Sequence, residues 1–321
     1  MSDDEGATKL DRAGGPGAAG HHQHDPEVPP LRPLLVLTEE ELLVLTDGEL
    51  GAVPSRIEVP TDQGAAELVR TVATRTLMAR GLITPGDSGQ RSPVVPSGPG
   101  SHGPGSAGVD QDGEGIPWDA TEPLGLSLSL RALAPVVVVL QRVLGPLESE
   151  QQPGRPPEST LAVRYLHLHA EVAVIEDVTP DGMHGLLTVF PDRYAEAVAD
   201  FIRPKDAVAG SGGVRTLSDQ AAADGLGGGS VLGLLAELGH PTVLVEVALL
   251  RAWFGGPSEQ DPVQLMLALG PSGTFWSEDS RTYHPIDPDR AISELLARAL
   301  AGEPGRPWTP QGSGAGAGGP T

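Results

Sequence analysis

The stretch LAVRYLHLHAEVAVIEDVTPDGMHGLLTVFPDR, residues 161–193, decides the fold. Its apolar and β-branched residues predict β-strands within 161–176. Residues 179–182, Thr-Pro-Asp-Gly, place proline second and glycine fourth in a β-turn, so 183–190 is expected to pair back. A helix then begins at Pro191, with one apolar face formed by Ala195, Val198, Phe201 and Ile202. The sequence therefore predicts an antiparallel meander closed by an amphipathic helix.

A similar arrangement recurs near the C-terminus. Strands are predicted at 242–253, 263–269, 274–277 and 282–285, before a helix that turns Ile292, Leu295, Leu296 and Ala299 inward. Both helices open with Pro-Asp-Arg, and their apolar positions agree in phase. An internal duplication explains this, but proline and aspartate are also favoured at any helix start. We predict an α+β fold of two quasi-repeated antiparallel sheet-plus-helix halves around one core, with the two helices in related positions on two sheets.

The N-terminal part of the fold is predicted to be mainly helical. Residues 34–37 form a short apolar strand, and Thr38 and Glu41 form a capping box that starts a helix. A second helix, 65–80, carries apolar positions at Leu68, Val69, Val72, Leu77 and Met78, and Gly81 follows as its C-terminal cap. We expect this second helix to pack against a sheet and to contact no DNA. Residues 124–134 fit either a strand or a helix, and we favour the helix.

Composition sets the domain organisation. Residues 1–30, a linker at 86–122 and a tail at 303–321 are rich in Gly, Pro, Ser and acidic residues, which predicts disorder. One α+β domain is expected at 31–302, interrupted by that linker. The chain has 43 acidic and 21 basic residues, and a net charge of -22 disfavours nucleic acid and anionic membranes as partners. Cysteine is absent, and the acidic N-terminus lacks the pattern of a signal peptide, so we expect a cytoplasmic protein.

Candidate chemistry in the sequence is sparse. His167 and His169 lie two apart on a predicted strand and would face the same way, but no further metal ligands have matching spacing. The acidic run 110–115 lacks glutamate at the twelfth position of a calcium loop, and the Gly-rich segment 225–230 lacks the Lys-Ser/Thr ending of a phosphate-binding loop. No nucleophile motif is present. We therefore expect no catalytic residue, no metal and no cofactor.

The order of elements resembles the EspG family, the cytosolic chaperones of actinobacterial type VII secretion. Its opening is matched by LTEEELLVL at 37–45 and LMARGL at 77–82. Its later half is matched by EDVTPDG at 176–182, by LALGPSGTFW at 267–276, and by the Pro-initiated helix within 285–300. The resemblance implies a quasi-two-fold fold that binds PE–PPE-type or related helical secretion substrates and keeps them soluble until export.

Three aromatic residues are candidates for contact with such a partner. Trp253, Phe254 and Trp276 stand out in a chain with 3% aromatic residues. They either fill the core between sheet and helix or, if exposed, anchor a protein interface. The alternative function is a winged-helix-type transcriptional regulator that uses residues 31–85, although that segment is acidic rather than basic. A protein partner, not nucleic acid and not a membrane, is the expectation.

Overall fold

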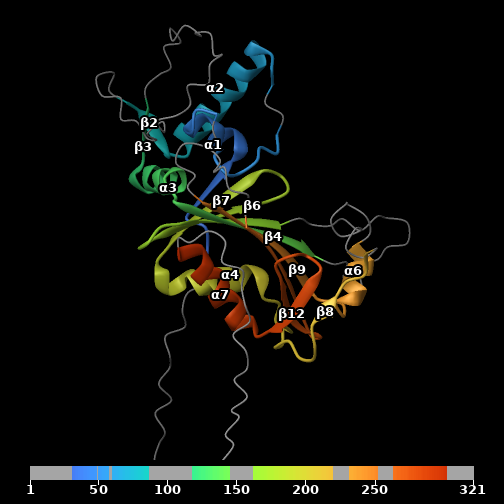
Figure 1. Ribbon diagram of the computed structural model, residues 1–321. Coiled ribbons are helices and arrows are strands. Elements are labelled where there is room, and N and C mark those ends of the chain that lie inside the picture. The colour runs from blue at the N-terminus through green and yellow to red at the C-terminus, as the bar shows by residue number, and fades with distance from the viewer. Residues whose placement is uncertain are drawn as a thin grey trace, which may run out of the picture. The chain divides into compact units, whose positions relative to one another are not determined.

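The computed structural model describes residues 31–48, 50–57, 60–86, 118–144, 162–219, 231–251 and 263–301 (Figure 1). The predicted tails, most of the predicted linker and the Gly-rich segment lie outside the described residues. From Arg32 onwards the described elements belong to one compact unit. None of the helices described there is long and apolar enough to cross a lipid bilayer.

Ten of the described strands form one sheet, in which every neighbouring pair is antiparallel. Its order is β1-β7-β6-β5-β4-β9-β10-β11-β12-β8. The strands are β1 (Leu35–Thr38), β4 (Val136–Leu144), β5 (Ala162–Leu168), β6 (Ala173–Val178), β7 (Met183–Val189), β8 (Arg215–Thr216), β9 (Val243–Arg251), β10 (Val263–Gly270), β11 (Gly273–Ser277) and β12 (Thr282–Ile286). A separate pair is formed by β2 (Ile83–Pro85) and β3 (Trp118–Ala120).

The helices are α1 (Glu39–Leu45), α2 (Gln63–Ala79), α3 (Glu122–Ala132), α4 (Tyr194–Ile202), α6 (Val231–Glu237) and α7 (Pro288–Leu300). A 3-10 turn, η2 (Pro191–Arg193), leads into α4. Helices α1, α2 and α3 lie on one side of the sheet, and α4 and α7 lie on the other (Figure 1). Because helices cover both faces, β5 is buried at six consecutive positions instead of alternating.

Two similar halves meet in the middle of the sheet. Strands β4 to β7 run in chain order away from the centre and are followed by α4, and β9 to β12 do the same before α7. The α+β class and the two sheet-plus-helix halves agree with the prediction. The prediction that the two helices lie on two separate sheets is wrong. All nine residues of β4 pair with all nine of β9, so one sheet is continuous. This pairing satisfies backbone groups that two separate sheets would leave exposed at their edges.

The apolar faces of α4 and α7 meet the sheet largely as predicted. Val198, Phe201 and Ile202 are buried, as are Ile292, Leu295 and Ala299 on α7. Two positions differ: Leu296 is only partly buried, and Ala195 is exposed and lines a hollow of about 260 Å³ between the two helices. Tyr194 and Ala197 occupy the buried side in its place.

The N-terminal elements form as the sequence predicts. The Thr38 hydroxyl accepts from the Glu41 amide at 3.2 Å, and the Glu41 carboxylate accepts from the Thr38 amide at 3.0 Å. Helix α2 ends before Gly81, whose φ of 68° suits glycine. The principal neighbours of α2 are α1 and β2, so the sheet that α2 contacts is the small pair of β2 and β3 and not the ten-stranded sheet. Strand β1 joins the large sheet, which means that residues 31–85 do not form the free-standing winged helix of the alternative.

The predicted linker ends before its expected bound of 122. Trp118–Ala120 pairs with Ile83–Pro85, and α3 begins at Glu122. Thr121 donates its amide to the carbonyl of Leu82 at 2.9 Å, which continues this pairing up to the start of α3. Pairing with β2, a partner distant in sequence, orders a segment whose own composition predicted disorder.

Candidate functional site

Of the three aromatic residues predicted as possible partner anchors, the structure describes only Trp276, and it is buried. Trp276 lies on β11 with 0% of its surface exposed, and the Arg298 guanidinium lies 5.3 Å from its ring centre. Trp276 therefore fills the core, as one of the two alternatives for these aromatics had it. Trp253 and Phe254 lie outside the described residues.

The two candidate histidines bind different partners. His167 Nε2 lies 2.8 Å from Glu176 Oε2, whereas His169 Nε2 lies 2.8 Å from the carbonyl oxygen of Leu130. Within the described part of the chain, no three His, Asp or Glu side chains are grouped so that they could hold a metal ion.

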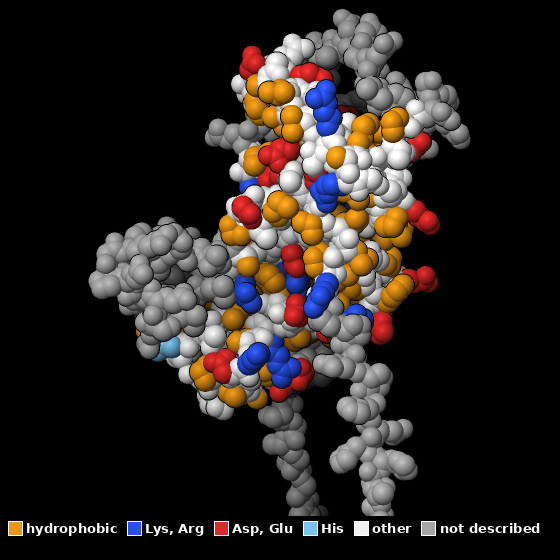
Figure 2. All heavy atoms as spheres, turned by 180° about the vertical axis from the view of Figure 1, so that it is seen from behind, with side chains coloured by type: hydrophobic (Ala, Val, Ile, Leu, Met, Phe, Trp, Pro, Cys, Tyr) orange, Lys and Arg blue, Asp and Glu red, His pale blue; other side chains and the backbone are white. Residues whose placement is uncertain are grey.

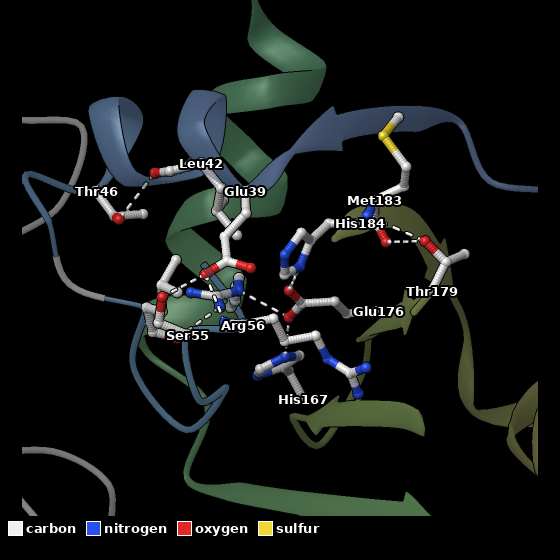
Figure 3. A network of polar contacts seen from close by, with 12 residues as sticks. Glu39, Leu42, Thr46, Ser55, Arg56, His167, Glu176, Thr179, Met183 and His184 are labelled. Atoms are coloured by element: carbon white, nitrogen blue, oxygen red, sulfur yellow. Dashed lines mark hydrogen bonds and ion pairs between the residues drawn. The ribbon is translucent and has the colours of Figure 1, made fainter. Parts of the chain in front are cut away.

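Four buried side chains form a polar cluster around Glu176. His167, Glu176 and His184 project from adjacent strands β5, β6 and β7 onto the same face of the sheet, and Arg131 reaches them from α3. Arg131 Nε donates to Glu176 Oε2 at 2.8 Å, and His184 Nδ1 lies 2.7 Å from Glu176 Oε1. Figure 3 shows the Glu176 carboxylate between the two histidine rings.

Electrostatics keeps Glu176 ionised. Burial alone would raise the pKa of Glu176, but the charge of Arg131 and the hydrogen bonds from His167 and His184 hold the pKa well below the usual value. Burial lowers the pKa of His167, although its hydrogen bond to Glu176 opposes that change. An ionised carboxylate only accepts hydrogen bonds, so the ring nitrogen of each histidine that faces Glu176 is the donor.

This Glu176 cluster links α3 to strands β5, β6 and β7 in the observed conformation. All four side chains are at most 5% exposed, and the buried carboxylate accepts from three donors. Arg131 also donates to the carbonyl oxygen of Leu50 at 2.6 Å, which joins α3 to the chain between α1 and α2. A substrate in solution does not contact a carboxylate that is 0% exposed.

His167 should make stability depend on pH. Since its folded pKa lies below the ordinary value of 6.5, the unfolded chain binds more protons as the pH falls. The contribution of His167 to the free energy of unfolding is fully present above about pH 6.5. It declines as the pH falls through the pKa of His167 in the folded protein. The variant His167→Gln keeps a donor for Glu176. Its free energy of unfolding, measured with urea, should fall less than that of the wild type between about pH 6.5 and 5. Equal pH slopes for the two proteins would contradict this assignment.

Two further buried carboxylates, on α1, bind the segment that leads into α2 and the residue that follows its C-terminal end. Glu39 Oε1 accepts from the amides of Arg56 and Ile57 at 2.8 and 3.2 Å, and from the Ser55 hydroxyl at 2.5 Å. Glu41 pairs with Arg80, just beyond the end of α2, at 2.6 Å. Both contacts start from the first turn of α1. They fix the connection into α2 and its C-terminal end, while the N-terminal part of the helix has no such contact with α1.

The N-terminal part of α2 exposes apolar side chains. None of its first ten residues, Gln63–Val72, is buried, and the helix buries only Ala73 and Leu77. Leu68 is 64% exposed and Val72 is 54% exposed. With Arg75 and Ala79, which are also exposed, they follow a spacing of four, three and four residues. We call these four residues the outer stripe of α2, and they lie on the side opposite Ala73 and Leu77.

The outer stripe lies on a part of the molecule that is open to solvent. Figure 2 shows hydrophobic and basic side chains next to one another at the end where α2 lies. Arg75 makes no ion pair with any residue that the structure describes, whereas Arg70 on another side of the helix pairs with Glu67 at 3.0 Å. The stripe is therefore an apolar surface with one uncompensated positive charge.

Sequence reasoning missed both the cluster and the stripe. A signal for the cluster was present, because Glu176 alternates with Val174 and Val178 on the inward side of a strand. A buried carboxylate at such a position requires a charged or hydrogen-bonding partner. The stripe had no such signal, since Leu68 and Val72 have the spacing of core residues.

Comparisons of the sequence alone find no match, whereas the comparison of structures does. No family model matches the chain, and no curated protein matches it. The structure is similar to that of the Mycobacterium tuberculosis type VII secretion system chaperone EspG5, solved in complex with a PE25–PPE41 dimer. The two share 12% sequence identity with a TM-score of 0.44, and the match covers 85% of this chain and 98% of that chain.

Proposed function

We propose that this protein is a non-enzymatic cytosolic binding protein, a chaperone or adaptor for helical type VII secretion substrates. The observation that carries the proposal is the outer stripe of α2, where Leu68 and Val72 are more than half exposed. A helix that only covers its own core has a polar outer side. Apolar side chains in a row on that side instead match the way in which proteins bind helical segments.

The arrangement of charge supports a binding function. The carboxylates of Glu39, Glu41 and Glu176 face inward and accept hydrogen bonds from other parts of the same chain. On the outer stripe of α2, another molecule meets apolar side chains and an arginine, whereas Glu67 and Arg70 are exposed on other sides of the helix. The resemblance of the sequence to the EspG family supplies the substrate class, PE–PPE-type or related helical proteins that must stay soluble before export.

Affinity capture with the full-length protein from its native cytosol, followed by mass spectrometry, tests the proposal. We expect enrichment of small helical secretion substrates over a resin control. A captured substrate should then remain soluble when it is co-expressed with this protein and precipitate when it is expressed alone. Equal solubility in both cases contradicts the chaperone function, and recovery of promoter DNA in a parallel genomic immunoprecipitation favours a transcriptional regulator.

A further inference from the structure

We propose that the outer stripe of α2 binds an amphipathic helix that carries a carboxylate next to its apolar face. This inference rests on the proposed function and names the chemistry of the partner at one surface. Leu68 and Val72 supply the apolar contacts, and Arg75 supplies the ion pair. Leu68 and Arg75 are seven residues apart on α2, which corresponds to about 10 Å along the helix axis.

The geometry of the stripe favours a helical partner. Its members recur every three or four residues and form one straight ridge on α2. Ridges of this spacing pack into the grooves of a second helix at interaxial distances of about 8–10 Å. Ala79 at one end is small, so a partner helix can approach closely there.

The charge on the outer stripe favours a partner helix that carries a carboxylate. The chain has 43 acidic residues, yet the four positions of the stripe include none, and its one charge is Arg75. At physiological ionic strength, charges more than about 8 Å apart are largely screened, so a ligand on the stripe responds mainly to Arg75 and its neighbours. Arg75 has no described ion-pair partner, and a carboxylate of the bound helix would compensate it.

Two designed peptides provide the probe. Both are alanine-rich and about 20 residues long, because shorter isolated helices are only marginally stable. They share leucines at positions i, i+4 and i+7. One places two glutamates beside the leucines at one end, and the other has glutamine at those sites. Fluorescence anisotropy measures the affinity of each labelled peptide for the full-length protein.

The wild-type protein should bind the glutamate peptide saturably and a few-fold more tightly than the glutamine peptide. Leu68→Asp combined with Val72→Asp should weaken binding of the glutamate peptide at least tenfold. Arg75→Glu should remove the preference for glutamate and leave the glutamine peptide unaffected. Leu126→Asp is the matched control, because Leu126 on α3 is 52% exposed but lies outside the stripe. Its affinity should stay within about twofold of the wild type, since scattered exposed apolar residues are ordinary.

Several outcomes overturn the inference. These are the absence of saturable binding, equal affinity of the wild type for both peptides, and an unchanged affinity in the double variant. A wild-type dimer that becomes monomeric in the double variant, measured by light scattering, would assign the stripe to a second copy of this chain. If the double variant still captures helical substrates from the cytosol, the inference fails while the proposed function stands. All variants must match the wild type in urea unfolding, which the exposure of the substituted side chains leads us to expect.

Discussion

Replacing Glu176 by alanine should lower the free energy of unfolding by about 3–5 kcal/mol, the usual cost of removing one member of a buried ion pair. The change leaves the Arg131 guanidinium buried without its carboxylate and removes the acceptor of both His167 and His184. It also loosens the link between α3 and the sheet. Urea denaturation of the full-length protein, followed by circular dichroism, measures the loss.

Glu196→Ala is the matched control. Glu196 also pairs with an arginine, Arg193 at 2.7 Å, but the pair lies at the surface within the segment that starts α4. Surface pairs of this kind contribute less than about 0.5 kcal/mol. Similar losses in the two variants would show that the Glu176 cluster does not support the fold in the way that its burial and its three donors indicate.

Replacing Gly210 by alanine should cost at least about 3 kcal/mol, at the upper end for an overpacked site. The Gly210 amide donates to the Ile286 carbonyl at 2.8 Å, so this segment runs directly against β12. A Cβ atom at Gly210 would lie 2.1 Å from the carbonyl oxygen of Thr274 and 2.8 Å from the amide nitrogen of Ile286. Both are backbone atoms of the sheet and have no alternative rotamer, so the segment itself must move away.

Gly213→Ala, three residues further along, is the control that distinguishes the effect of this close packing from the general effect of replacing a glycine. A Cβ atom there meets no other atom within 4 Å. Gly213→Ala should therefore change stability by less than about 1 kcal/mol, and in the stabilising direction if the unfolded chain loses freedom. The two midpoints in urea can be compared directly. If they coincide, the close packing against Thr274 and Ile286 is not what stabilises this region.

Local patterns accounted for most of the elements. The capping box at Thr38 and Glu41 depends on residues three apart, and the turn at 179–182 depends on four consecutive residues. Such features are formed by the chain's own neighbours, so they can be predicted without knowing the rest of the fold. The strands β5, β6 and β7 and the helix α7 were predicted for the same reason.

Non-local contacts decided the rest. The pairing of β4 with β9 unites residues about 100 positions apart and turns two predicted sheets into one. Strand β3 was assigned to a disordered linker, because its order comes from β2 and not from its own composition. For the Glu176 cluster, α3 must first be placed over β6 and β7 before Arg131 meets Glu176.

By itself the sequence determined the α+β class, the order of the meander elements, and the helix starts at Thr38 and Pro288, because each follows from periodicity or capping within a few residues. Only the tertiary structure decided which apolar side chains stay outside the core. Leu68 and Val72 have the same spacing as buried residues, but α2 extends beyond α1, and only its C-terminal part is covered. Burial is a property of the neighbours that a residue acquires when the chain folds, and periodicity does not specify them.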